Sequence, residues 1–64
     1  MSRDAWIAEL LADESPWMVA CAAYYAGLHD VVAVAAQLRT LAAHPDAMVS
    51  REAAAAAARF GVAA

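Results

Sequence analysis

The sequence has no lysine, and its four arginines are spread along the chain rather than gathered in one segment. Seven acidic residues leave a formal net charge of −3. Nucleic-acid binding needs a clustered basic surface, so the chain lacks the electrostatic footprint of a protein that binds DNA or RNA. Hydrophobic residues make up 66% of the chain, which excludes a disordered acidic tail.

Cysteine and glycine are almost as scarce. The single cysteine, Cys21, excludes a disulfide within the chain and favours a reducing compartment, so we expect a cytoplasmic protein. The two glycines, Gly27 and Gly61, stand alone, which excludes a glycine-rich phosphate-binding loop. The N-terminal residues carry Asp4 early and lack a basic and then apolar progression, so they do not resemble a signal peptide.

Large apolar side chains are few, because alanine supplies much of the hydrophobic content of the 64 residues. A domain of this size buries only about 60% of the surface that its unfolded chain exposes. The sequence therefore predicts one small domain, residues 1–64, that is helical by propensity and short of core. We expect such a domain to bind a partner protein or to associate with itself.

The segment from Ser15 to Gly27 is predicted to form the central helix of the domain. Ser15 suits the N-cap position, and Pro16 suits the first helical position, where its missing N–H costs nothing. The helix that follows has no polar face, and such a helix is normally buried on several sides. We therefore expect it to lie between the segments before and after it and to end at Gly27.

Three further helices are predicted by capping residues and by apolar residues at helical spacing. We expect them over residues 3–13, 31–44 and 47–61. Their predicted N-cap residues are Ser2, Asp30 and Asp46, with Ser50 as the alternative cap of a shorter last helix. The expected fold class is all-α, with four short helices in two antiparallel hairpins that form an α-α superhelix.

A membrane span is the alternative interpretation of residues 18–36. These 19 residues approach the length that crosses a bilayer, but His29 and Asp30 interrupt them. An aspartate near the bilayer centre costs about 2.5–3.5 kcal/mol on insertion. Gly27 followed by the two polar residues predicts a turn instead, so we expect no membrane insertion.

An internal repeat of about thirty residues relates the two halves of the chain. Shifted by thirty positions, Met18-Val19 falls on Met48-Val49. The predicted helix break at residues 13–16 falls on the break at residues 43–46. Self-similarity near this period is typical of an α-solenoid, in which each unit packs only against its neighbours. The approximate units are residues 2–28 and 30–61.

Both breaks resemble a known family. Residues 10–27, LLADESPWMVACAAYYAG, resemble the turn and second helix of a HEAT repeat of the short bacterial, phycocyanin-lyase type. Residues 44–54, HPDAMVSREAA, resemble the same place in the next unit. The resemblance implies a HEAT-like solenoid of two repeats that serves as a non-catalytic protein-interaction or scaffold module. Two repeats are fewer than a free-standing solenoid needs, so we expect a fragment, an end piece or a module completed by another protein.

Similarity to other members of the same family implies two alternative functions. The Pro-Trp and Ala-Cys-Ala-x-Tyr combination, at residues 16–24, is similar to HEAT segments attached to bacterial nucleotide-carrier-like membrane proteins. This similarity implies a regulatory segment of a larger membrane-carrier or sensor protein. Other HEAT-like relatives imply an accessory role in chromophore attachment, for which Cys21 is the one available attacking group.

No arrangement of side chains in the sequence suits catalysis or metal binding. Cys21 and His29 are eight residues apart, which is about 12 Å along a helix and beyond the reach of a nucleophile and its base. Cys21 between alanines is interpreted as a small core residue. His29 and His44 lack a third ligand at metal spacing and are interpreted as a turn and a helix-end residue. We therefore expect no enzyme activity, no cofactor and no metal.

The candidate partner-contact residues are Trp17, Tyr24, Tyr25 and Arg51. Trp17 is interpreted first as a core side chain packed near Trp6 and Leu10. The alternative is an anchor for a partner, since tryptophan is favoured in binding hot spots. Tyr24 and Tyr25 point in different directions on a helix, so we expect one to be buried and the other to make contacts. Arg51 is expected to be solvated.

Overall fold

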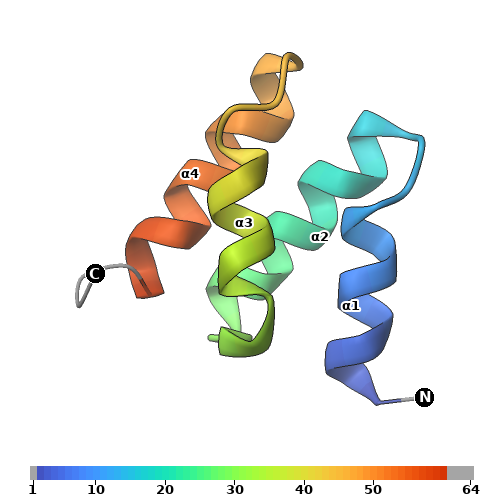
Figure 1. The fold of residues 1–64 in the computed structure, drawn as a ribbon, viewed down its shortest axis with the longest axis vertical. Helices are drawn as coiled ribbons and strands as arrows, with labels where there is room; N and C mark the ends of the chain where they lie inside the picture. Colours follow the sequence, from blue (N-terminus) through green and yellow to red (C-terminus); the bar gives the residue numbers. More distant parts are fainter. Residues whose placement is uncertain (1, 61–64) are drawn as a thin grey trace.

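The computed structural model describes residues 2–60, which form four α-helices and one short 3₁₀ turn (Figure 1). These elements are α1 (Arg3–Leu11), α2 (Pro16–Leu28), the turn η1 (Val32–Val34), α3 (Ala35–Leu41) and α4 (Ala47–Phe60). The predicted all-α fold class is confirmed. Within residues 2–60, every helix is too short or too polar to cross a membrane. The predicted end of the last helix at Gly61 lies outside the described residues.

Side-chain caps begin three of the helices at the predicted residues. Ser2, Ser15 and Asp46 accept hydrogen bonds from backbone N–H groups in the first turns of α1, α2 and α4, at distances of 2.9 to 3.4 Å. Pro16 occupies the first turn of α2, as predicted. The Nδ1 atom of His44 accepts a further bond from the Asp46 N–H at 3.0 Å. These contacts satisfy N–H groups that a helix leaves without internal partners.

The end of α2 differs from the prediction, because the helix continues through Gly27 to Leu28. Asp30 follows with a φ of 53°, in the left-handed region that aspartate tolerates better than most residues. The Val31 N–H donates to the Ala26 carbonyl at 2.9 Å, and the Asp30 N–H donates to the Gly27 carbonyl at 3.5 Å. This is the Schellman pattern of a helix C-terminus. Asp30 therefore ends α2 and does not cap the third helix.

The first and third helices are shorter than predicted. α1 ends at Leu11 rather than Asp13, and α3 ends at Leu41 rather than His44. The chain enters α3 through η1, and neither segment has a side-chain cap. Burial of Val31 and Val34 holds this entry against the rest of the molecule instead.

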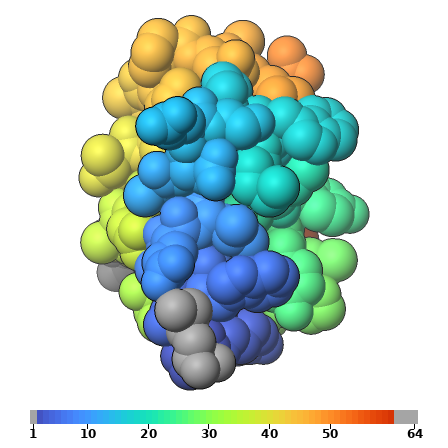
Figure 2. Space-filling model, turned by 90° about the vertical axis from the view of Figure 1, so that its right-hand side faces the viewer, coloured from blue at the N-terminus to red at the C-terminus, as the bar shows by residue number. Residues whose placement is uncertain are grey.

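Successive helices run in opposite directions, so α1 and α3 rise where α2 and α4 descend in Figure 1. α2 packs against both α1 and α4, and α3 packs against α4. The molecule is a slab of 29 × 28 × 16 Å. In the side view of Figure 2, α3 (yellow-green) lies toward one broad face and α2 (teal to green) toward the other.

Residues in the first half of the chain contact residues 29 positions further along, in the second half. The Gln37 side-chain amide donates to the Ala8 carbonyl at 3.5 Å, across 29 positions of the sequence. A Cβ atom built on Gly27 would lie 2.9 Å from the Cα of Ala56, which is also 29 positions further along. The two halves of the chain are therefore in contact at an offset close to the predicted period of thirty residues.

Small side chains make up much of the core. Within residues 2–60, six of the thirteen buried hydrophobic residues are alanines, and they are Ala20, Ala22, Ala23, Ala26, Ala53 and Ala56. The largest fully buried side chains are Ile7, Val31, Val34, Leu38 and Val49. Alanines allow the backbones of α2 and α4 to approach closely, but each contributes little buried apolar surface. The core thus has few large side chains, as the composition predicts.

Candidate interaction surface

The outer side of α2 carries large apolar side chains and no charge. The buried side of this helix consists of alanine, valine and Gly27. After Pro16 at the start of the helix, the exposed residues are Trp17, Met18, Cys21, Tyr24, Tyr25 and Leu28. Within residues 2–60, α1 and α4 are the helices that pack most closely against α2, so its apolar circumference is covered in part and the remainder is exposed. A contiguous apolar surface of this kind is typical of a binding site.

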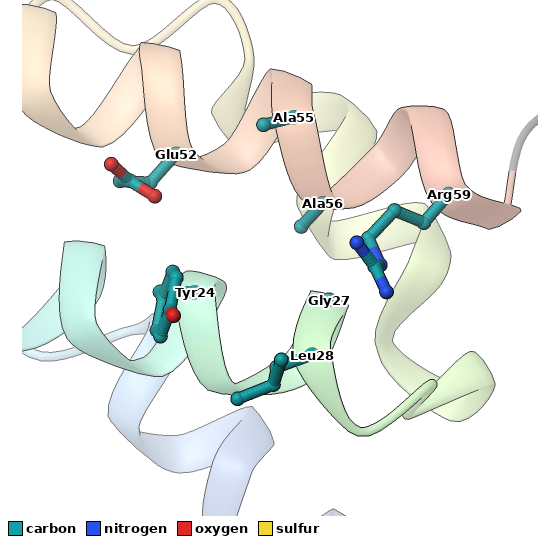
Figure 3. Close-up of a pocket in the computed structure, with 7 residues that line it drawn as sticks. All are labelled: Tyr24, Gly27, Leu28, Glu52, Ala55, Ala56 and Arg59. Carbon is teal, nitrogen blue, oxygen red and sulfur yellow. The ribbon is translucent and has the colours of Figure 1, made fainter.

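A groove between α2 and α4 adjoins this apolar surface. It consists of two hollows of about 220 and 210 Å³ that share Tyr24 and Glu52 in their walls. The first is lined by Tyr24, Gly27, Leu28, Glu52, Ala55, Ala56 and Arg59 (Figure 3). The second is lined by Trp17, Ala20, Cys21, Tyr24, Met48 and Glu52.

The two walls of the groove use the same helical spacing. Each wall presents residues at i, i+4, i+7 and i+11, which lie on one face of a helix. The α2 wall is Trp17, Cys21, Tyr24 and Leu28, and the α4 wall is Met48, Glu52, Ala55 and Arg59. The groove therefore runs along both helices.

The charged residues of the groove are Glu52 and Arg59, both on α4. In Figure 3, Glu52 lies over Tyr24, and Arg59 extends toward Gly27. Within residues 2–60, the ion pair that the structure contains is Arg3–Asp4, at 3.3 Å. Neither Glu52 nor Arg59 therefore forms an ion pair with another residue of that part of the chain.

Trp17 and Tyr24, two of the predicted partner contacts, come together in the groove. Their side chains are 65% and 59% exposed. The interpretation of Trp17 as a core residue near Trp6 and Leu10 is wrong, since Trp6 is itself 56% exposed. Hydrophobicity alone does not distinguish the outward face of α2, because every face of the helix is apolar.

Tyr25 and Arg51 lie outside the two hollows. Tyr25 is 37% exposed and packs on His29, with the ring centroids 4.2 Å apart and the planes inclined at 33°. Arg51 is exposed on α4, as expected. The prediction that one of Tyr24 and Tyr25 is buried is wrong, because α2 turns both outward.

Cys21 is exposed in the groove rather than buried in the core, so the interpretation as a core residue is also wrong. His29 occupies the turn after α2, as interpreted, and forms its C-cap. Within residues 2–60, no three His, Cys, Asp or Glu side chains are grouped closely enough to hold a metal ion.

The prediction from sequence omitted the α4 wall, namely Met48, Glu52 and Arg59, together with Leu28 on α2. The matching spacing of the two walls is a signal that the sequence contains. Recognising it requires knowing that α2 and α4 lie side by side, which neither helix indicates alone.

Comparison of the chain with protein-family models, curated proteins and solved structures gives no match. The function is therefore inferred from the surface itself.

Proposed function

We propose that this chain is a non-catalytic interaction module that binds an α-helix of a protein partner along the α2–α4 groove. One observation carries the proposal: the exposed side of α2 consists of large apolar side chains and forms one wall of the groove between α2 and α4. A helix-in-groove complex buries large apolar side chains at intervals of three and four residues. Trp17 and Tyr24 are the expected anchors, since such aromatic residues supply much of the binding energy of protein interfaces.

The resemblance to HEAT repeats supports an interaction role of the scaffold type. Repeat proteins of this class use faces formed by stacked helices as extended binding surfaces. The contacts of Gln37 with Ala8 and of Gly27 with Ala56, both across 29 positions, are consistent with two stacked units. A partner that covers α2 would also supply the apolar neighbours that a core of this composition lacks.

The test is selection of a ligand from a display library of helical peptides, with positions i, i+3, i+4 and i+7 randomised. The protein is immobilised at low density, so that each copy is isolated. We expect the selected peptides to carry large apolar residues at the randomised positions. Trp17→Ala and Tyr24→Ala should each weaken their binding by about tenfold or more, the loss typical of a hot-spot residue.

The matched control is Trp6→Ala, which removes the same type of side chain from α1, outside the groove. This control should bind the selected peptides as the wild type does. Failure to enrich any helical peptide would contradict the proposal. So would selected peptides that bind the Trp17→Ala and Tyr24→Ala variants as tightly as the wild type.

A further inference from the structure

We infer that the partner helix carries two charged residues seven positions apart, a basic one that faces Glu52 and an acidic one that faces Arg59. The inference rests on the proposed function, because it states the chemistry of the partner at the same surface. It depends on where the two charges of α4 lie in the groove, on their lack of ion pairs within residues 2–60 and on the uncharged wall formed by α2.

Glu52 lies where the two hollows of the groove meet. It lines both of them, as Tyr24 does, and it is half-buried in the free chain. A helix bound along the groove covers Glu52 and removes water from around its carboxylate. Burying a carboxylate without a partner is strongly unfavourable, whereas an opposite charge within reach offsets much of the cost. The partner therefore needs a basic residue at this point.

Arg59 lies at the other end of the first hollow (Figure 3). Its stem lies against Gly27, since its Cδ atom is 3.3 Å from the place that a Cβ atom at position 27 would take. This contact places the guanidinium group beside the part of the groove that Leu28 lines. Arg59 is exposed, so covering it costs less than covering Glu52. A carboxylate is the complementary group for a guanidinium, so the partner has an acidic residue here.

The two charges of α4 set the spacing of the charges on the partner. Glu52 and Arg59 are seven residues apart, which is two turns and about 10 Å along the helix axis. A helix that lies along α4 presents its own residues at the same interval, so a basic and an acidic residue seven positions apart face both α4 charges at once. Either direction of the partner helix satisfies this pairing. The charges therefore determine its register along the groove and not its direction.

The α2 wall restricts the partner's charges to one edge of its helix. The wall residues Trp17, Cys21, Tyr24 and Leu28 carry no charge. Partner residues that face α2 are therefore apolar, and the charged residues lie on the edge that faces α4. The expected partner is an amphipathic helix with an apolar stripe bordered by the charge pair. A helix that is apolar all round leaves both α4 charges covered and unpaired, so it binds less tightly.

Four helical peptides, titrated against the full chain at low protein concentration, test the charge pattern. They share one apolar stripe and differ at two edge positions seven residues apart, which are lysine and glutamate, two leucines, two glutamates or two lysines. The lysine–glutamate peptide should bind most tightly. Two glutamates place a like charge on Glu52 and should raise the dissociation constant by about tenfold or more. Two lysines place one on the exposed Arg59 and should raise it by about threefold, as should two leucines.

Charge reversals on α4 should change which peptide is preferred. Glu52→Lys makes both groove charges basic, so this variant should bind the two-glutamate peptide most tightly. Arg59→Glu makes both acidic and should favour the two-lysine peptide. The matched controls are Glu9→Lys on α1 and Arg39→Glu on α3, which reverse exposed charges outside the groove and should keep the wild-type preference. Circular dichroism on each variant verifies that the helices are retained.

Cys21 reports the register of the bound peptide. It lines the hollow that contains Trp17 and is absent from the walls of the hollow that contains Arg59. A peptide cysteine in the apolar stripe beside the lysine should therefore form a disulfide with Cys21 by thiol–disulfide exchange. A cysteine beside the glutamate should react about tenfold more slowly, because binding does not raise its effective concentration at Cys21. Mass spectrometry quantifies both products, and Cys21→Ala should abolish them.

Three outcomes would overturn the inference. The first is a two-leucine peptide that binds at least as tightly as the lysine–glutamate peptide. The second is an unchanged order of preference in Glu52→Lys and Arg59→Glu, and the third is equal cross-linking from the two cysteine positions. If the peptides still bind and need Trp17, the proposed function stands without the charge pattern. If none of the peptides binds, and none is selected by display, both proposals fail.

Discussion

Leu38→Ala is expected to leave the chain largely unfolded at room temperature. Leu38 is 0% exposed and is among the largest fully buried side chains of the described structure. Replacing such a leucine with alanine costs about 2–5 kcal/mol, from lost burial and from the cavity that remains. A chain of 64 residues has a total stability of only about 3–10 kcal/mol, and alanine-rich packing places this one toward the lower end. Loss of the Leu38 side chain therefore removes much of the free energy of unfolding.

Urea denaturation followed by far-UV circular dichroism measures the effect. Leu28→Ala is the matched control, because it makes the same chemical change at a side chain that is 51% exposed. It should cost about 1 kcal/mol or less. Because Leu28 lines the groove, this variant should also weaken binding while it preserves the fold. Equal loss of stability in both variants would contradict the placement of Leu38 in the core and Leu28 at the surface.

Gly27→Val is expected to separate α2 from α4. A Cβ atom at position 27 would lie 2.9 Å from both the Cα and the Cβ of Ala56, and 3.3 Å from the Cδ of Arg59. The Arg59 stem can rotate aside, but the backbone of Ala56 cannot. Valine stabilises a helix relative to glycine by a few tenths of a kcal/mol, whereas overpacking costs about 1–3 kcal/mol. The cost of overpacking exceeds the gain in helix propensity, so the free energy of unfolding should fall by about 2 kcal/mol.

Ala54→Val provides the comparison, since it places valine at an exposed position on α4. It should change the unfolding free energy by about 0.5 kcal/mol, which is the difference in helix propensity alone. The same urea titrations compare the two variants. A Gly27→Val protein as stable as wild type would show that the helices are not in close contact at Ala56.

Much of the fold follows from local chemistry that the sequence displays. Ser2, Ser15 and Asp46 begin helices where predicted, because each side chain satisfies N–H groups of its own first turn. Leu38 and Val49 are buried where their helical spacing places them. These features depend on residues a few positions apart, so a single sequence is sufficient to find them.

The features that the sequence did not predict depend on contacts between distant segments. Gly27 was expected to end α2, yet it lies within the helix. A glycine is needed at this position because Ala56 leaves no room for a side chain there. The helix ends instead at Leu28, and Asp30 follows it in a left-handed conformation for which glycine is the usual residue.

Trp17 and Cys21 were interpreted as core residues because a helix that is apolar all round is normally covered on several sides. The closely packed neighbours of α2 are α1 and α4, which leave one side of it exposed. The distinguishing sign is size. The small residues Ala20, Ala23 and Gly27 face the protein, and the large residues face outward.

The proposed binding surface requires Trp17 to be exposed in the free chain, and tryptophan fluorescence measures this exposure directly. Trp6→Phe leaves Trp17 as the one tryptophan of the protein and changes a side chain outside the groove. In dilute solution, we expect emission typical of a solvated indole and strong quenching by acrylamide. A selected helical peptide should then shift the emission to shorter wavelength and protect it from the quencher. The contradicting result is short-wavelength emission that resists acrylamide in the dilute monomer and does not change when the peptide is added. That result would place Trp17 in the core and exclude it from the binding surface.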